Sequence, residues 1–495
     1  MPEEQVQAQS APAATAEVSE FESLMNKEFK PKSAEAKSAV KLAVQTLAEQ
    51  ALASTSLISD NAIRTIEAII AEIDRKLSEQ INLILHHEDF KALEGSWRGL
   101  HYLVNNTETG ENLKIRIMNI SKKDVSKTLR KYKGTAWDQS PLFKKLYEEE
   151  FGMPGGQPYG CLLGDYYFDH SAPDVEMLGG IAQISAAAHA PFLTAAAPSL
   201  LNMETWQELS NPRDLAKIFG TPAYAAWKSL RESEDARYLG LTMPRVLARM
   251  PYGPKTNPVE DFAFEEDTAG ADHNKYTWTN AAYAMATNVT RSFKLYGWCA
   301  RIRGAESGGM VEGLPVHSFP TDDGGVDMKC PTEIGITDRR EKELADCGFM
   351  PLSHWKNTDY AVFVGAQSLQ KPQAYDDADA TANANLAARL PYLFATCRFA
   401  HYLKCMVRDK IGGFSTKESL ESWLNKWIGN YVTANPGASD ETKAKLPLAA
   451  AEVVVEENPE NPGYYSSKFY LKPHYQLEGL TVSLRLVSKL PSNKK

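Results

Sequence analysis

Apolar residues recur at every third or fourth position through residues 34 to 104, which is the spacing of one face of an α-helix. The clearest stripe consists of Ile63, Ile66, Ile70, Ile73 and Leu77. This pattern predicts a helical region over residues 34–105. A stripe so rich in isoleucine suits pairing with a second chain, although packing within the same chain explains it equally well.

A shorter helix is predicted before this region. Residues 1–18 are rich in Ala, Gln, Glu and Pro, and they carry too little apolar surface to offset the entropy lost on ordering. Before Pro31, four apolar side chains share one helical face: Phe21, Leu24, Met25 and Phe29. So short a helix needs a surface to dock on, either its own body or a partner. We therefore expect residues 1–33 to form a flexible arm with a short amphipathic helix.

Alternating apolar and polar residues mark the strands of a central region over residues 106–450. Residues 112–119, with the sequence NLKIRIMN, alternate in this way and should open the first sheet. Residues 161–168 (CLLGDYYF) and 361–368 (AVFVGAQS) are predicted to be further strands, with mostly helical patterns following the first of them. Strands mixed with helices in this order predict a mixed α/β core of the α+β class.

Two further segments of this central region read as helical. Residues 181–201 lack formal charges, but they are mostly alanine and contain Pro191 and Pro198. They favour a buried helix ending near Pro191 over a membrane span. Residues 372–390 are a polar loop leading into a helix, and residues 391–411 continue the helical pattern.

The C-terminal region, residues 451–495, reads as a linker followed by a β-strand arm. Residues 452–462 contain four glutamates and no basic residue. Beyond them, Phe469 and Leu471 suggest one strand, and a second strand has four alternating apolar residues: Leu480, Val482, Leu484 and Leu486. An edge strand at the end of a chain can pair with another chain.

Composition narrows the class of protein. At 495 residues the chain exceeds the size of one compact core, and its 43% hydrophobic and 24% charged residues are ordinary for a globular protein. The formal net charge of -9 argues against a nucleic-acid partner, because a protein that binds nucleic acid needs a concentrated patch of basic residues. Six scattered cysteines suit reduced thiols in a cytoplasm, and the N-terminus lacks the basic and apolar regions of a secretory signal.

The motifs of common enzyme chemistry are missing from the sequence. No GxGxxG or GxxxxGK[ST] stretch occurs, HHED at 86–89 lacks the second histidine of HExxH, and GAESG at 304–308 misplaces the serine of GxSxG. No cysteine or histidine spacing indicates a metal site, so we expect no cofactor, no metal and no catalytic residue. The alternative is a cytosolic enzyme whose site assembles from distant residues such as Asp165, His170, His317 and Cys330.

Five segments, in order, resemble the large subunit of the type VI secretion contractile sheath, the TssC or VipB family. The first is RESEDARYLGLTMPRVLARMPYG at 231–253. The others are WTNAAYAMATNVTRSFKLYGWCARIRGAESGGMVEGLPVHSF at 278–319, PTDDGGVDMKCPTEIGITDRREKELADCGFMPL at 320–352, CRFAHYLKCMVRDKIGGF at 397–414 and FYLKPHYQLEGLTVSLRLVSKLP at 469–491. They cover most of the chain after about residue 160.

This resemblance implies a phage-tail-sheath-like core and a structural role in the bacterial cytoplasm, without membrane insertion. The family's large subunit polymerises with a small subunit, TssB or VipA, and with copies of itself around a tube of Hcp, above a baseplate. The polymer contracts, and the ClpV unfoldase recycles it. The resemblance assigns the helix of Phe21, Leu24, Met25 and Phe29 to unfoldase binding and the helical region of residues 34–105 to the small subunit. A sheath of another phage-like contractile particle shares this mechanism and remains the second alternative.

Overall fold

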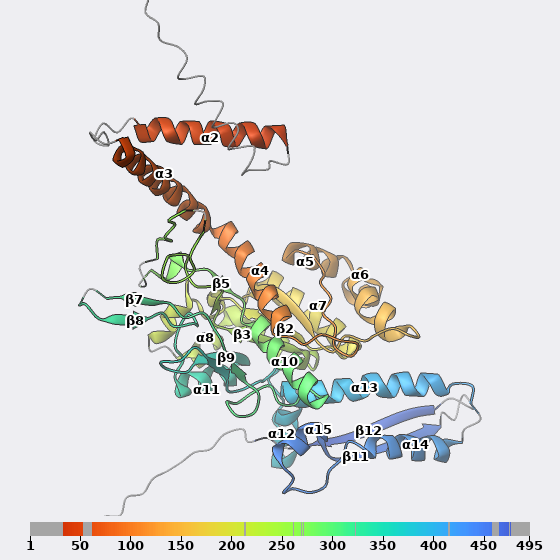
Figure 1. Cartoon of the computed structure of the whole chain (residues 1–495). Coiled ribbons are helices and arrows are strands. Elements are labelled where there is room, and N and C mark those ends of the chain that lie inside the picture. Colours follow the sequence, from red (N-terminus) through yellow and green to blue (C-terminus); the bar gives the residue numbers. More distant parts are fainter. Residues whose placement is uncertain are drawn as a thin grey trace, which may run out of the picture. The chain divides into compact units, whose positions relative to one another are not determined.

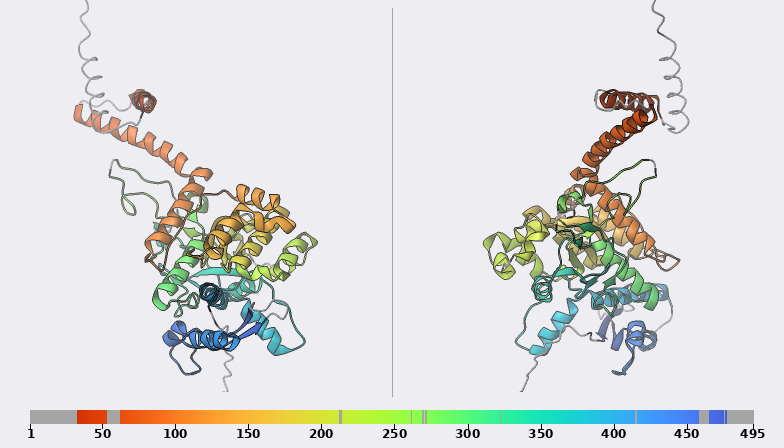
Figure 2. Two further views of the ribbon diagram at one scale, coloured as in Figure 1. Left: turned by 90° about the vertical axis from the view of Figure 1, so that its right-hand side faces the viewer. Right: turned by 60° about the vertical axis from the view of Figure 1, so that its left-hand side comes forward.

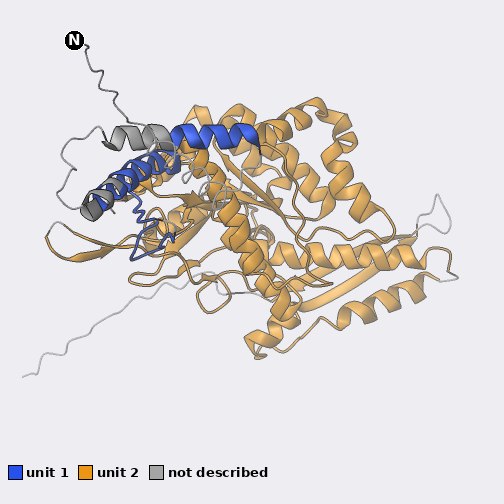
Figure 3. Ribbon diagram, turned by 45° about the horizontal axis from the view of Figure 1, so that its top comes forward, with its two compact units in different colours: residues 1–85, 252–267 blue, residues 86–251, 268–495 orange. Residues whose placement is uncertain are grey.

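The computed structural model describes residues 33–52, 62–211, 214–260, 262–268, 270, 272–321, 323–413, 416–457, 465–474 and 476. The chain divides into two compact units, which Figure 3 shows in different colours. Unit 1 comprises residues 1–85 and 252–267, and unit 2 comprises residues 86–251 and 268–495.

The described residues of unit 1 form two helices and a distant segment of the chain. Helices α2 (Ala34–Leu52) and α3 (Ala62–Leu85) contact each other. Both helices lie in the region that the spacing of apolar residues predicted to be helical, and this prediction is confirmed. The side chain of Asn82 on α3 fixes the segment 252–267. Its Nδ2 donates to the carbonyl oxygen of Glu265 at 3.3 Å, and its Oδ1 accepts from the backbone N–H of Asp267 at 2.9 Å.

Unit 2 is built on a six-stranded mixed sheet (Figure 1) with the strand order β1-β2-β3-β9-β10-β6. The strands are β1 (Leu162–Phe168), β2 (Phe192–Ala196), β3 (Leu239–Met243), β9 (Phe349–His354), β10 (Ala361–Phe363) and β6 (Met310–Val311). The first four are parallel, and β10 pairs antiparallel with both β9 and β6. The predicted mixed α/β class is confirmed, as are β1 and the first half of the strand expected at 361–368.

Successive side chains of the strands enter two different cores, because neighbouring residues in a strand point to opposite faces. Phe192 and Phe349 lie in the core that includes α7 (Ala172–Ala188), whereas Leu193 and Met350 lie in the core that includes α10 (Ala282–Tyr296) and α13 (Leu390–Lys410). The sheet is therefore covered by helices on both faces.

Helix α7 is the buried helix predicted to end near Pro191. It ends at Ala188, and the left-handed His189 turns the chain into β2. Strand β2 was not predicted, because its short, fully buried sequence FLTAA has no alternation that separates a strand from a helix.

The C-terminal part of unit 2 has its own apolar core. Helices α13 and α14 (Lys417–Gly429) contribute Phe399 and Leu424, and β11 (Leu448–Glu457) contributes Val453 and Val455. Strand β11 pairs antiparallel with β12 (Tyr465–Pro473), and the two form a separate sheet (Figures 1 and 2). Residues 451–457, whose acidic composition suggested a linker, thus belong to a strand, because Val453 and Val455 alternate into this core.

The remaining elements of unit 2 connect these parts. The longer helices are α4 (Glu88–Asn105), α5 (Lys122–Lys131), α9 (Ala225–Glu232), α11 (Asp338–Asp346) and α12 (Ala378–Ala387). Short helices are η2 (Gly134–Gln139), α6 (Pro141–Phe143), η3 (Lys144–Gly152), η4 (Pro198–Leu201), η5 (Trp206–Ser210), α8 (Leu215–Phe219), η6 (Pro222–Tyr224), η7 (Asp235–Tyr238), η8 (His273–Lys275) and α15 (Asp440–Lys445). Two small two-stranded sheets pair β4 (Val246–Leu247) with β5 (Trp278–Thr279), and β7 (Ser318–Pro320) with β8 (Val326–Met328). Among the helices described, none combines the length and apolar character that a bilayer crossing requires.

A buried ion cluster joins three distant parts of unit 2. The Glu333 side chain is fully buried, and its carboxylate accepts from Arg245 Nη2 at 2.5 Å and from the backbone N–H of Arg245 at 2.9 Å. The Nε2 atom of His273 lies 2.9 Å from the same carboxylate. Burial alone would raise the pKa of Glu333, but the hydrogen bond with His273 and the charge of Arg245 outweigh it and lower the pKa to about 2.

Helix α4 approaches β5 so closely that glycine is required at the contact. A Cβ atom on Gly95 would lie 2.4 Å from the carbonyl oxygen of Trp278. We expect Gly95→Ala to lower the free energy of unfolding by about 1–3 kcal/mol, because backbone atoms must move apart. Gly429, at the end of α14, has no atom within 4 Å of an added Cβ and provides the matched control. Urea titration of both variants measures the difference, and equal stabilities would contradict the close contact.

Candidate interaction surfaces

Helix α4 is fixed to the body of unit 2 by a charged network on its inner face. The Glu94 carboxylate accepts from Arg249 Nε at 2.6 Å, from Arg98 Nε at 2.8 Å and from Thr277 Oγ1 at 3.1 Å. Burial alone would raise the pKa of Glu94, but the hydrogen bonds and charges of the two arginines lower it. The Thr279 hydroxyl also donates to the carbonyl oxygen of Gly95 at 2.8 Å. These contacts determine which face of α4 points outward.

The outward face of α4 carries an apolar stripe, which we define as Phe90, Leu93, Trp97 and Val104. Their spacing places them on one side of the helix, opposite Gly95. Trp97 is 66% exposed and Leu93 is 57% exposed in the single chain. Large apolar side chains gathered on one exposed face mark a surface for another molecule.

Residues 112–119 are not the strand that their alternation predicted. They form no strand, and residues 114–120 make no backbone–backbone hydrogen bond with any other part of the chain that the structure describes. The alternation nevertheless places the side chains correctly, because Leu113 and Ile115 are half-buried whereas Lys114 and Arg116 are exposed. The segment has the side-chain pattern of a strand and lacks a partner strand.

Side chains hold this segment against the body of unit 2. Lys114 Nζ donates to Gln157 Oε1 at 3.0 Å, and Arg116 forms an ion pair with Glu150. Ile115 packs against the cluster of Leu103. Ile117 and Met118, in contrast, are exposed. The backbone groups of the segment are therefore held in place and remain available for pairing.

The stripe predicted on α3 lies partly within the described side chains. Ile70 is exposed, and Ile73 and Leu77 are half-buried. Ile63 and Ile66 lie on α3, but their side chains fall outside the described residues. The stripe on α4 has the same helical spacing and was missed, although the sequence carried that signal in Phe90, Leu93 and Trp97.

The other two sets of predicted interface residues lie outside the part of the chain that the structure describes. One set is the short N-terminal helix, with Phe21, Leu24, Met25 and Phe29, and the other is the C-terminal arm, with Leu480, Val482, Leu484 and Leu486. Their roles remain predictions.

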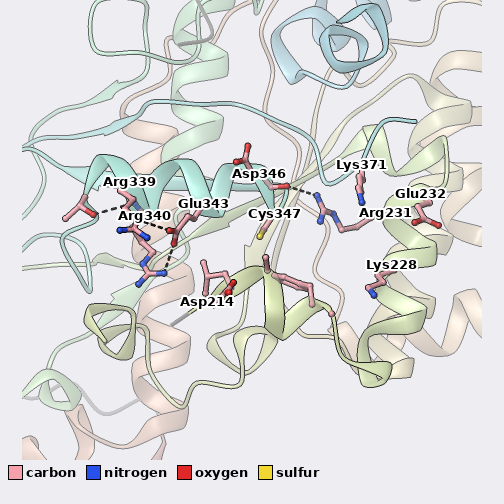
Figure 4. Close-up of a pocket in the computed structure, with 15 residues that line it drawn as sticks. Asp214, Lys228, Arg231, Glu232, Arg339, Arg340, Glu343, Asp346, Cys347 and Lys371 are labelled. Carbon is pink, nitrogen blue, oxygen red and sulfur yellow. Dashed lines mark hydrogen bonds and ion pairs between the residues drawn. The ribbon is translucent and has the colours of Figure 1, made fainter. Parts of the chain in front are cut away.

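An open pocket of about 1000 Å³ lies between α8, α9 and α11 (Figure 4). Its charged side chains are largely satisfied within the protein. Arg339 and Arg340 converge on Glu343, at 3.2 Å and 2.7 Å. Arg231 donates from Nε to the carbonyl oxygen of Leu369 at 3.0 Å and from Nη2 to that of Asp346 at 3.2 Å.

The pocket offers no activated nucleophile. Its one thiol, Cys347, is buried, and burial raises the pKa of this thiol to about 11 in spite of the nearby Arg231. A thiol with so high a pKa stays protonated near neutral pH and reacts slowly. Arg231 therefore connects α9 to the end of α11 and to the segment at Leu369, whereas the ion pairs of Glu343 lie within α11.

The four residues of the alternative enzyme site have separate partners. The charge of Asp165 acts on the hydroxyl of Tyr283, and the ring of His170 stacks on Tyr224 with centroids 4.2 Å apart. His317 Nδ1 lies 2.7 Å from the Tyr276 hydroxyl. Cys330 Sγ lies 3.2 Å from Thr332 Oγ1. Within the described residues, no group of three or more His, Cys, Asp or Glu side chains is arranged to hold a metal ion.

Two family models match successive parts of this chain. Residues 67–370 match the family VipB, described as EvpB/VC_A0108, tail sheath N-terminal domain. Residues 379–490 match VipB_2, described as EvpB/VC_A0108, tail sheath gpW/gp25-like domain. The Type VI secretion system sheath protein TssC1 of Pseudomonas aeruginosa strain PAO1 is 71% identical over 481 residues, which cover 97% of each chain.

Two solved structures show weaker similarity. A chain of the anti-feeding prophage baseplate has 13% identity and a TM-score of 0.39, covering 80% of this chain and 87% of its own. A chain of the contracted sheath complex of the extracellular contractile injection system PVC has 10% identity and a TM-score of 0.32, covering 62% of this chain and 68% of its own. Because both TM-scores are low, neither structure provides evidence that its domains are arranged as in this chain.

Proposed function

This chain belongs to the EvpB/VC_A0108 family of tail sheath proteins and is a type VI secretion sheath subunit, and we propose that it assembles with a small subunit, TssB or VipA, around a tube of Hcp. The 71% identity to TssC1 favours this function over an enzyme or a sheath of another phage-like particle. The protein works in the bacterial cytoplasm on a baseplate. Its role is structural.

The apolar stripe on α4 is the observation that best supports the contact with the small subunit. Trp97 and Leu93 are too exposed to stabilise the single chain, and burying them in a partner would remove a large apolar area from water. Tryptophan is among the residues that dominate binding energy when an interface covers it. The stripe of Ile63, Ile66, Ile70, Ile73 and Leu77 on α3 of unit 1 is a separate candidate surface for the same partner.

The segment 114–119, whose backbone makes no backbone–backbone hydrogen bond within the described chain, supplies a second element of this contact. Its exposed Ile117 and its unpaired backbone groups suit the addition of a strand from the small subunit. Backbone hydrogen bonds would then supply affinity, and the stripe on α4 would supply specificity. The segment lies in the same unit as the stripe, so one partner can contact both.

Copies of the chain are joined through the C-terminal arm. Among the residues described, the sheet of β11 and β12 has two strands, and each of its edges can pair with a further strand. The alternating residues Leu480, Val482, Leu484 and Leu486 would add a strand to the sheet of a neighbouring copy. A contact of this kind does not close on itself, and it therefore generates a filament.

Contraction requires two arrangements of the same polymer. Rigid bodies connected by extended arms can rotate while they stay linked. A small difference in free energy per subunit adds up over a long polymer, so no nucleotide hydrolysis is needed during firing. The helix of Phe21, Leu24, Met25 and Phe29 is exposed differently in the two arrangements and is the handle by which ClpV recognises the contracted sheath.

Two deletions test this proposal, and each is a control for the other. Co-expression of the full-length chain with the small subunit should yield hollow rods in electron micrographs. Deletion of residues 477–495 should abolish rods while the two subunits still copurify, because the arm joins copies and not the two subunits. Deletion of residues 1–30 should leave rods intact and abolish ClpV binding in a pull-down.

The proposal has two parts, strand exchange through the arm and recognition by ClpV, and each deletion can refute one of them without the other. Rods formed by the chain without residues 477–495 would refute the strand exchange. Undiminished ClpV binding by the chain without residues 1–30 would refute the assignment of the handle.

A further inference from the structure

The last residue of the chain that the structure describes, Gln476, is held on unit 2 by three hydrogen bonds. Its backbone N–H donates to the hydroxyl of Tyr392, a buried residue of α13, at 2.9 Å. Its side-chain Oε1 accepts from Arg303 Nε at 2.8 Å, and its Nε2 donates to the carbonyl oxygen of Ala300 at 2.8 Å. The side-chain amide thus uses both its acceptor and its donor, which fixes its orientation. These partners lie 84 to 176 residues away in the sequence.

The connection that carries Arg303, between α10 and β6, is built firmly into the body of unit 2. Arg303 is 6% exposed, and its neighbour Ile302 is fully buried in the core of α10 and α13. On the other side, the N–H of Gly304 donates to the carbonyl oxygen of Phe363, on β10, at 2.8 Å. The hydrogen bonds of Gln476 therefore connect the end of the described chain to the six-stranded sheet.

Without these bonds, tension in the C-terminal arm would act first on β12. Gln476 follows β12, which ends at Pro473, and Pro473 pairs with Leu448 at one end of β11. Among the strands described, β12 pairs with β11 alone. A pull at this end would separate the two strands one residue pair at a time, because the terminal pairs of a sheet open with the smallest cost in free energy. A pull on Gln476 instead loads three hydrogen bonds together.

We propose that Gln476 is a positioning residue that fixes the start of the C-terminal arm and transmits tension in that arm to the six-stranded sheet. This inference rests on the proposed role of residues 477–495 in joining copies of the chain, and it adds the point at which the arm is fastened. Subunits that rotate while they stay linked need each arm attached to the rigid body of the subunit. The bond from Arg303 is charge-assisted and is therefore stronger than a bond between neutral groups.

Amide hydrogen exchange of the full-length chain, alone or with the small subunit, tests the anchor itself. Gln476→Ala removes both side-chain bonds. The backbone N–H of residue 476 should then exchange roughly tenfold faster, because two hydrogen bonds of ordinary net strength no longer hold the site closed. Tyr392→Phe removes only the acceptor of that N–H and should also accelerate its exchange. Unchanged exchange in both variants would overturn the anchor.

Rods assembled with the small subunit test whether the anchor carries tension. After the same shearing through a narrow needle, rods of Gln476→Ala and of Tyr392→Phe should be shorter in electron micrographs than rods of the unchanged chain. The small subunit should copurify with all of them to the same extent. Tyr392 is buried in unit 2, so shorter rods in Tyr392→Phe do not arise from an altered contact between the arm and a neighbouring copy. Gln207→Ala is the matched control, because Gln207 is exposed on η5 and should change neither exchange nor rod length.

The possible failures are distinguishable. Faster exchange in the variants together with rods of unchanged length would show that the anchor carries no tension, and the proposal would be wrong. Failure of the strand exchange itself has a different signature. Rods would then form without residues 477–495, while the N–H of Gln476, which that deletion keeps, would still be protected from exchange. In that case the anchor exists, but its role in transmitting tension is refuted together with the strand exchange.

Discussion

Replacement of Glu333 with alanine should lower the free energy of unfolding by about 3–5 kcal/mol, because it removes the buried carboxylate that pairs with the half-buried Arg245. The Glu333 side chain is fully buried and bonds to both Arg245 and His273. Urea titration at pH 7 measures the loss. Glu333→Gln keeps the shape of the side chain and should cost less than Glu333→Ala.

The pH dependence of stability tests the same cluster independently. The pKa of Glu333 is about 2, below the ordinary carboxyl value, so ionised Glu333 stabilises the folded state at every pH above that ordinary value. This contribution, about 3 kcal/mol, should be lost as the pH falls from about 4.5 to about 2. Glu333→Gln should lack this part of the pH dependence.

A surface ion pair provides the control for this experiment. Glu149 pairs with Lys145 at 3.5 Å, and both side chains are more than half exposed. Glu149→Ala should leave stability nearly unchanged, because exposed pairs contribute little. If Glu333→Ala and Glu149→Ala were equally stable, the cluster would have no structural role.

Replacement of Trp97 with lysine should weaken binding of the small sheath subunit by roughly thirtyfold or more, which corresponds to about 2 kcal/mol at a buried tryptophan. Trp97 is 66% exposed in the single chain, so the variant should fold normally. Lysine is a good helix former and keeps α4 intact. Titration of the purified small subunit by calorimetry, or copurification if the free chain is insoluble, measures the effect.

Trp355→Lys is the matched control. Trp355 is 52% exposed and lies between β9 and β10, away from α4 in the chain. The Trp355→Lys variant should bind the small subunit with the same affinity as the unchanged chain. Equal binding by the two lysine variants would show that the apolar stripe on α4 is not the contact surface.

Local patterns in the sequence predicted the elements whose stability depends on their own residues. The period of apolar residues marked helices α2, α3 and α4, and the sequence CLLGDYYF marked β1. Five ordered segments indicated the family, which the match over residues 67–370 confirms. These features follow from neighbours in the chain.

The wrong and missed elements have a different origin. Residues 112–119 alternate as a strand does, yet a strand needs a partner to complete its hydrogen bonds, and the described chain supplies none. Strand β2 was missed because burial on both faces removes alternation. Strand β11 was obscured by its glutamates, which lie on its exposed positions.

The sequence by itself determined the mixed α/β class, the helical N-terminal region and the sheath family, because periodicity and motif order are properties of consecutive residues. Only the tertiary structure decided which groups meet. Glu333 bonds to Arg245, 88 residues away, and His317 lies 2.7 Å from the hydroxyl of Tyr276, 41 residues away. Contacts between distant residues depend on strand order and register, which local patterns do not encode.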